Sequence, residues 1–182
     1  DLADRLRGVG AIAASPGTDL GSARRCNSAS VVGAITASRC RCNLGFAGDG
    51  SADLGPGNDR AFGGRGNDHL RGEQGADRLF GGPGDDHLEG LAGPDLLVGG
   101  RGNDTLQGDV PLVGDKISRD RLWGGPGDDT LHGGDGNDRI HGGRGQDTIA
   151  AQGGDDRIFA RDGERDVIDC GPGFDRVRAD AK

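Results

Sequence analysis

Apolar and polar positions follow one nine-residue pattern, G-G-x-G-x-D-x-(apolar)-x, eleven times between Leu54 and Phe159. The eighth position is always aliphatic: Ala61, Leu70, Leu79, Leu88, Leu97, Leu106, Leu122, Leu131, Ile140, Ile149 and Ile158. An aliphatic residue between two outward-pointing positions has the alternation of a very short β-strand. The glycine-rich first six positions predict a turn. The chain is therefore expected to be all-β, with one turn and one strand in each repeat.

The sixth position of every copy is aspartate: Asp59, Asp68, Asp77, Asp86, Asp95, Asp104, Asp120, Asp129, Asp138, Asp147 and Asp156. Segments such as GGRGNDHL (63–70) and GGDGNDRI (133–140) resemble the RTX, or haemolysin-type, calcium-binding nonapeptide repeats. The resemblance implies a right-handed parallel β-roll of two short-stranded parallel sheets, with calcium in the turns. Two successive nonapeptides would make one coil, so each repeat would lie beneath the next but one.

Stacking of this kind places the aspartates of alternate repeats roughly 4.8 Å apart, one strand spacing. Carboxylates so close repel each other unless a cation lies between them. Calcium suits this position because it accepts six to eight oxygen ligands in flexible geometry, whereas magnesium requires a tighter octahedron. We therefore expect the eleven aspartates to be metal ligands, and their two columns to provide about nine inter-rung calcium sites.

Composition supports metal-coupled folding, because 39 glycines, five Phe, one Trp and no Tyr leave little for an ordinary core. The fixed aliphatic position argues against the alternative of a disordered acidic linker. A formal charge of −8 would ordinarily argue against a nucleic-acid partner, and we expect none. If the eleven motif aspartates are used as calcium ligands, however, the 22 basic residues outnumber the remaining acids, so the calcium-free and calcium-bound forms should differ in the sign of their charge. No stretch approaches the ~20 apolar residues of a membrane span. Four cysteines, Cys26, Cys40, Cys42 and Cys170, fit an oxidising extracellular compartment.

The repeat period divides the chain into an N-terminal segment (1–53), the β-roll (54–159) and a C-terminal cap (160–182). An insertion near 109–118 predicts a loop, and Arg165 stands where the next aspartate is due. The sequence CRCNLGFAGDG (40–50) resembles the closing half of an EGF-like module, which implies a Cys26–Cys40 pair. The half-repeat DRLRG (4–8) either caps its own roll, extends a neighbouring one, or is leftover sequence.

Sorting the outward positions by sheet separates two faces. On the odd-numbered repeats, position nine reads Phe62, Phe80, Val98, Trp123, His141 and Phe159, and position seven reads Arg60, Arg78, Leu96, Arg121, Arg139 and Arg157. An apolar stripe beside an arginine row is typical of a contact surface. Self-association, binding of an anionic glycan and cover by the N-terminal segment remain open. On the polar face, His69 and His87 should stack one coil apart, either sharing a transition metal or simply facing solvent.

No Ser-His-Asp or Cys-His arrangement stands out, and calcium accounts for the acidic residues, so we do not expect an enzyme. The sequence predicts a secreted, extracellular calcium-binding structural or adhesive protein that folds on binding Ca²⁺. Head-to-tail assembly into fibres is one extension of this interpretation. Two alternatives are the C-terminal calcium-binding module of a larger secreted hydrolase or toxin, and a glycan-binding surface module.

Overall fold

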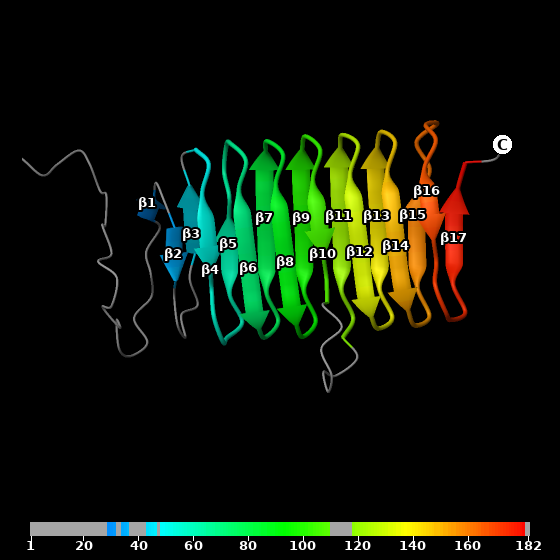
Figure 1. Ribbon diagram of the computed structural model, residues 1–182, viewed down its shortest axis with the longest axis horizontal. Helices are drawn as coiled ribbons and strands as arrows, with labels where there is room; N and C mark the ends of the chain where they lie inside the picture. The colour runs from blue at the N-terminus through cyan, green and yellow to red at the C-terminus, as the bar shows by residue number, and fades with distance from the viewer. Residues whose placement is uncertain (1–28, 32–33, 37–42, 47, 110–117, 181–182) are drawn as a thin grey trace, which may run out of the picture.

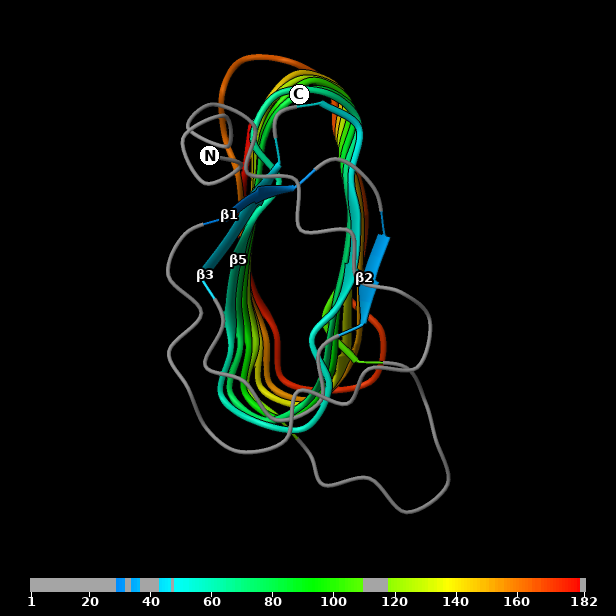
Figure 2. The same ribbon diagram turned by 90° about the vertical axis from the view of Figure 1, so that its left-hand side faces the viewer.

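The computed structural model describes residues 29–31, 34–36, 43–46, 48–109 and 118–180, and all of their regular structure is β. The strands form two parallel sheets that face each other (Figure 1), and the view along the long axis shows a flattened coil (Figure 2). The prediction of an all-β parallel roll of two sheets is therefore confirmed. The described residues contain no helix that is long and apolar enough to cross a membrane.

One sheet has nine strands and the other has eight. The nine-stranded sheet contains, in spatial order, β1 (Ala29–Val31), β3 (Asn43–Phe46), β5 (Arg60–Phe62), β7 (Arg78–Pro83), β9 (Leu96–Arg101), β11 (Arg121–Pro126), β13 (Arg139–Arg144), β15 (Arg157–Ala160) and β17 (Arg176–Ala179). The eight-stranded sheet contains β2 (Ala34–Thr36), β4 (Ser51–Asp53), β6 (His69–Gln74), β8 (His87–Ala92), β10 (Thr105–Gln107), β12 (Thr130–Asp135), β14 (Thr148–Gly153) and β16 (Val167–Asp169).

Strand register follows the repeat period, since each repeat pairs with the next but one. Leu70 lies opposite Leu88, and Leu79 lies opposite Leu97. Across the insertion the sequence offset grows but the register is kept, with Leu106 opposite Leu131. The eleven eighth-position residues are 0–1% exposed and fill the space between the sheets. One aliphatic column from each sheet is therefore enough to form the core.

Strands in the middle of the roll are longer than predicted. β6, for example, has six residues and runs through positions one to three of the following repeat. The early glycines continue the ladder: the N–H of Gly63 donates to the carbonyl of Phe80 at 2.7 Å, and that of Gly64 to the carbonyl of Gly81 at 2.8 Å. The expectation that six residues form the turn was wrong, because only positions four to six remain outside the strands there.

The second position of the repeat takes a positive φ in every copy except the one with the insertion, which explains its glycine. Gly82, at +126°, shows the constraint, because a Cβ there would lie 2.0 Å from the carbonyl oxygen of Gly64. Four copies lack this glycine. In one of them Asp109, at the start of the insertion, has no positive φ. In the other three, Glu73, Leu91 and Gln152 take φ values of 81°, 74° and 71°. These are the positive-φ residues other than glycine in the described part of the chain. Each carries backbone strain at this position.

Both sheets continue before the first nonapeptide. β3 pairs with β5, with Leu44 opposite Ala61, and β4 pairs with β6, with Ala52 opposite Leu70. The EGF-like interpretation of residues 40–50 finds no support, because β3 and β4 are successive strands of the solenoid. Cys26, Cys40, Cys42 and the half-repeat at 4–8 lie outside the described residues.

Beyond Phe159 the coil also continues, one residue longer than before. Val167 lies opposite Thr148, and Arg176 lies opposite Arg157. The sequence predicts that the repeat ends here, because Arg165 stands where the next aspartate is due. This prediction is wrong, since the extra residue moves the aspartate to Asp166. Cys170 is a free, half-buried thiol packed against the core. Most of the predicted insertion loop, residues 110–117, lies outside the described residues, and a bridge from Ser118 to Gly136 restores the register.

Candidate metal centres along the aspartate ladder

The sixth-position aspartates lie at the ends of the turns, immediately before the strands. All eleven are buried, with 1–3% of each residue exposed. Because alternate repeats stack, the aspartates form two columns, one along each edge of the roll. We define the odd edge as the turns carrying Asp59, Asp77, Asp95, Asp120, Asp138 and Asp156. The even edge consists of the turns carrying Asp68, Asp86, Asp104, Asp129 and Asp147.

One oxygen of each carboxylate links neighbouring rungs. The backbone N–H of Asp77 donates to Oδ1 of Asp95 at 2.8 Å, and this contact recurs along both columns at 2.7–3.0 Å. The ladder extends to Asp166 and Asp175, which accept the N–H groups of Asp147 and Asp156. Sequence reasoning missed these two as ladder members, because the longer last coil moves them out of the nine-residue period.

The second oxygen of most ladder carboxylates has no hydrogen bond although it is buried. This holds for Oδ2 of Asp68, Asp77, Asp86, Asp95, Asp104, Asp129, Asp138, Asp147 and Asp156. The oxygen lies against the first glycine of its own repeat, so that a Cβ on Gly63 would meet Oδ2 of Asp68 at 2.3 Å. A buried carboxylate oxygen without a hydrogen-bond donor is costly unless a cation neutralises it. These oxygens fit a hard divalent cation such as calcium.

Asp120 lies beside the insertion and differs from the rest of the ladder. The Ser118 hydroxyl lies 3.1 Å from Oδ2 of Asp120 and also contacts Oδ2 of Asp109. A hydroxyl has one proton, so it donates to only one of the two carboxylates at a time. Asp109 is buried as well, so it places a further carboxyl group at this point of the odd edge.

Burial raises the pKa of the ladder carboxyls, and neighbouring carboxylates raise it further. Raised pKa values are about 9 for Asp95, about 8 for Asp120, about 7 for Asp104 and Asp138, and about 6 for Asp68, Asp77, Asp129 and Asp156. The bonds from backbone N–H groups oppose this shift without overcoming it. In the protein alone, the ladder therefore resists full ionisation at neutral pH. A bound divalent cation would reverse that preference.

A second, exposed ladder runs through the fifth position of the repeat. On the even edge, Oδ1 of each fifth-position residue accepts the N–H of its counterpart one rung later, at 2.8–3.0 Å. The acceptors are Asp49, Asn67, Asp85, Asn103 and Asp128. On the odd edge, Asn58, Asn137 and Asp155 accept in the same way, but Ala76, Pro94 and Arg119 interrupt the ladder between them. Sequence reasoning missed this ladder. The sequence does contain a signal for it, because Asn or Asp recurs immediately before the sixth-position aspartate.

The outer face of the nine-stranded sheet carries the predicted stripe. Phe62 stacks on Phe80 with 4.9 Å between ring centroids, and His141 stacks on Phe159 at 4.3 Å. The guanidinium of Arg60 lies 4.7 Å above the ring of Phe62. The described N-terminal strands β1 and β3 extend this sheet at its edge (Figure 1). We call this surface the arginine–aromatic face.

A parallel β-solenoid with buried carboxylates one rung apart is the architecture of a calcium-binding β-roll. The family model described as the RTX calcium-binding nonapeptide repeat matches residues 53–88, 80–110, 118–149, 132–166 and 145–177. These matches cover more than half of the chain, which therefore belongs to the RTX family and is a calcium-binding RTX β-roll module. No curated protein and no solved structure matches the chain.

Proposed function

We propose that this chain is a secreted, non-catalytic structural or adhesive module whose β-roll folds when it binds calcium outside the cell. The observation that carries the proposal is the run of buried Oδ2 atoms without hydrogen bonds. RTX repeats are typical of secreted bacterial proteins. Because the unfolded chain lacks a preformed site, the free energy of calcium binding becomes free energy of folding.

The eleven sixth-position aspartates are the proposed ligands, together with carbonyl oxygens of the turns. Calcium supplies the positive charge that lets carboxylates one rung apart ionise together. The repeat aspartates alone predict about nine inter-rung sites. Asp166 and Asp175 extend the two columns by one rung each. The proposal therefore places two further inter-rung spaces at the C-terminal end of the roll.

The non-catalytic part of the proposal has three supports. Calcium coordination accounts for the acidic residues of the turns, and the four histidines lie on the outer faces of the strands. Burial, with the neighbouring charges of Asp175, Asp169 and Asp156, raises the pKa of the Cys170 thiol. A thiol of raised pKa is a poor nucleophile at neutral pH.

The test is circular dichroism and sedimentation of the same sample with millimolar calcium, with equal magnesium and with chelator. We expect β-structure with calcium only, because magnesium does not fit carboxylates spaced along a strand ladder. The variant Asp95→Asn/Asp138→Asn should need more calcium for folding than the matched surface variant Asp85→Asn/Asp128→Asn, which removes the same number of charges from exposed positions. Equal β-structure in all three solutions would contradict the proposal.

Assembly of the module is proposed to proceed head to tail. Support comes from the last coil, where Val167, Phe174 and Val177 are 62%, 88% and 42% exposed. β16 and β17 are the last strands of their sheets, and such edges accept a strand from another chain. We expect calcium to increase the sedimenting mass, and Val177→Lys to reduce that increase. A calcium-loaded protein that stays monomeric would instead favour a stabilising module of a larger secreted hydrolase or toxin.

A second candidate function is binding of an anionic glycan by the arginine–aromatic face. Arg121, Arg139, Arg157 and Arg176 lie on successive rungs and are exposed. One strand spacing of ~4.8 Å between them gives a row of cations suited to an extended polyanion. With the repeat aspartates neutralised by calcium, the 22 basic residues outnumber the remaining acids.

Retention on a sulfated polysaccharide column in calcium tests this second candidate. Arg139→Glu should elute at lower salt than the wild type, whereas Arg101→Glu, which makes the same charge change outside the row, should elute near the wild type. Identical elution of the two variants would contradict a role for the row.

A further inference from the structure

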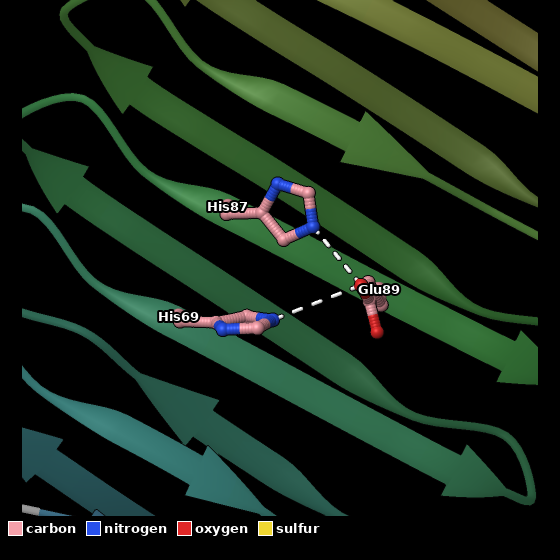
Figure 3. Close-up of side chains that lie close together, drawn as sticks. All are labelled: His69, His87 and Glu89. Carbon is pink, nitrogen blue, oxygen red and sulfur yellow. Dashed lines mark hydrogen bonds and ion pairs between the residues drawn. The ribbon is translucent and has the colours of Figure 1, made fainter.

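A cluster of metal-ligand type lies on the outer face of the eight-stranded sheet, away from the calcium ladder. β6 and β8 pair in parallel with His69 opposite His87, and Glu89 follows two residues after His87 on the same face (Figure 3). Nε2 of His87 lies 3.0 Å from Oε1 of Glu89, and Nε2 of His69 lies 3.7 Å from the same oxygen. One ligand atom from each residue lies within 4.8 Å of the other two.

We propose that His69, His87 and Glu89 bind a divalent transition metal of the zinc type. Two imidazole nitrogens and one carboxylate oxygen are a known ligand set for zinc, with water in the fourth position. Ligand bonds of ~2.0–2.1 Å in a tetrahedron place ligand atoms about 3.3 Å apart. The two observed nitrogen–oxygen distances lie on either side of that value, so small side-chain rotations are enough to close the site.

Donor chemistry separates this site from the calcium ladder. Calcium takes oxygen ligands, whereas imidazole favours zinc, copper and nickel. The side chains of His69 and His87 are 46% and 41% exposed, so a hydrated metal ion reaches them from solvent. Their backbones are held on neighbouring hydrogen-bonded strands, which fixes the spacing of the ligands before the metal arrives.

Arg71 positions the carboxylate. Its Nε donates to Oε2 of Glu89 at 2.8 Å, which leaves Oε1 facing the two imidazoles. Ion pairs with Asp53 and Glu73 hold the guanidinium in place. Burial opposes ionisation of Glu89, yet the hydrogen bond from His87 and the neighbouring positive charges lower its pKa overall. Such outer hydrogen bonds orient metal ligands in many sites.

His132 provides a matched control on the same sheet. It lies at the ninth position of its repeat, and its neighbours across the strands are Gln107 and Ala150. It therefore has the chemistry of a single half-buried imidazole without the partner residues of the proposed site. Loss of His132 should leave the proposed site intact.

The experiment is zinc titration by calorimetry of the full-length protein in excess calcium, comparing wild type, His69→Gln/His87→Gln and His132→Gln. We expect the double variant to lose one zinc equivalent, and His132→Gln to keep it. Arg71→Ala should weaken this equivalent about tenfold, as expected for a residue that orients a ligand. Because every variant keeps all four cysteines, thiol-bound zinc is the same throughout.

Cobalt absorption gives an independent readout. Wild type should show the bands of a tetrahedral nitrogen–oxygen site that are missing in the double variant. Calcium-dependent circular dichroism of the double variant should match the wild type, which separates loss of the site from loss of the fold. An unchanged zinc equivalent in the double variant, or no zinc binding by the wild type, would overturn the proposal.

Discussion

The two edges of the roll have the same repeat but different regularity. On the even edge, the second position is glycine in every copy, as in Gly64, Gly82 and Gly100. The three strained residues Glu73, Leu91 and Gln152 all lead into odd-edge turns. The repeat that the insertion interrupts, between Asp109 and Asp120 in the sequence, belongs to the odd edge as well. The even edge is therefore close to the ideal repeat, whereas these deviations from the repeat all occur on the odd edge.

Electrostatics and hydrogen bonding follow the same division. The exposed fifth-position ladder is continuous from Asp49 to Gln146 on the even edge. On the odd edge it is interrupted, and the two highest carboxyl pKa values, about 9 for Asp95 and about 8 for Asp120, lie there. Hydrogen bonds from backbone N–H groups to exposed Asp and Asn oxygens thus support the even edge without metal. The odd edge should depend more strongly on calcium.

The largest expected effect is the pH response of the calcium-free protein. A carboxyl whose pKa is raised on folding stabilises the fold below the unfolded value of 3.8, and this stability is lost as pH rises through the folded value. In chelator, β-structure should therefore be greatest in acid and fall as pH rises from the unfolded value of 3.8 to about 9, the folded value of Asp95. Circular dichroism against pH measures this. Calcium should abolish the loss.

Two aspartate variants test whether the pH-dependent loss of β-structure arises mainly at the odd edge. Asp95→Asn should extend calcium-free β-structure to higher pH, because it removes the carboxyl of highest pKa, whereas Asp68→Asn should change the profile less. Equal shifts in the two variants would contradict the stronger dependence of the odd edge.

Next in size is the effect of single aspartates on calcium-dependent folding. Asp120→Ala should raise the calcium concentration at the folding midpoint about tenfold, because it removes a ligand beside Asp95 and Asp138. Asp86→Ala on the even edge should have a smaller effect, since the exposed ladder holds its turn through Asp85. Calcium titrations followed by circular dichroism give both midpoints. A larger shift for Asp86→Ala would reverse the ranking of the edges.

Much of this organisation could be predicted from the period of the sequence. The aliphatic column predicted the core, the stacking of alternate repeats predicted the register, and the aspartate column predicted the ladder. The period did not predict the parts of the coil that depend on backbone pairing rather than on the type of side chain at each position. β3 and β4 lack the motif but satisfy the same strand pairing. Asp166 was not predicted, because one inserted residue breaks the nine-residue spacing although the coil itself continues.

The His69–His87 pair shows a second limit of the sequence. The period placed the two imidazoles one coil apart, and the pairing of β6 with β8 confirms this. The third proposed ligand, Glu89, was missed because it occupies the ninth position of its repeat, whereas the two histidines occupy the seventh. Sorting the sequence by position compares ninth positions only with one another. Diagonal contacts between position seven of one rung and position nine of the next depend on side-chain directions, which a column of residue types does not contain.

A smaller effect is expected from repairing the exposed ladder on the odd edge. Arg119→Asn would place a side-chain oxygen one rung before the N–H of Asn137, as Asn103 does for Asp128. One additional hydrogen bond of this kind is worth about 1 kcal/mol. Urea unfolding in saturating calcium measures the gain. The matched removal, Asn103→Ala on the even edge, should cost a similar amount. A gain in the first variant without a loss in the second would show that the charge of Arg119 matters more than the hydrogen bond.

The smallest effect concerns backbone strain on the odd edge. Gln152 takes a φ of 71° at a position where most copies have glycine. Gln152→Gly relieves about 1–2 kcal/mol of left-handed strain. It also gives the unfolded chain extra freedom, which offsets roughly half of this gain. We expect a net stabilisation of about 0.5–1 kcal/mol in saturating calcium, measured by urea unfolding. The reverse change on the even edge, Gly143→Gln, should destabilise by more, because a Cβ there would lie 1.9 Å from the carbonyl oxygen of Gly125. If Gln152→Gly destabilises the roll, strain at the second position does not distinguish the two edges.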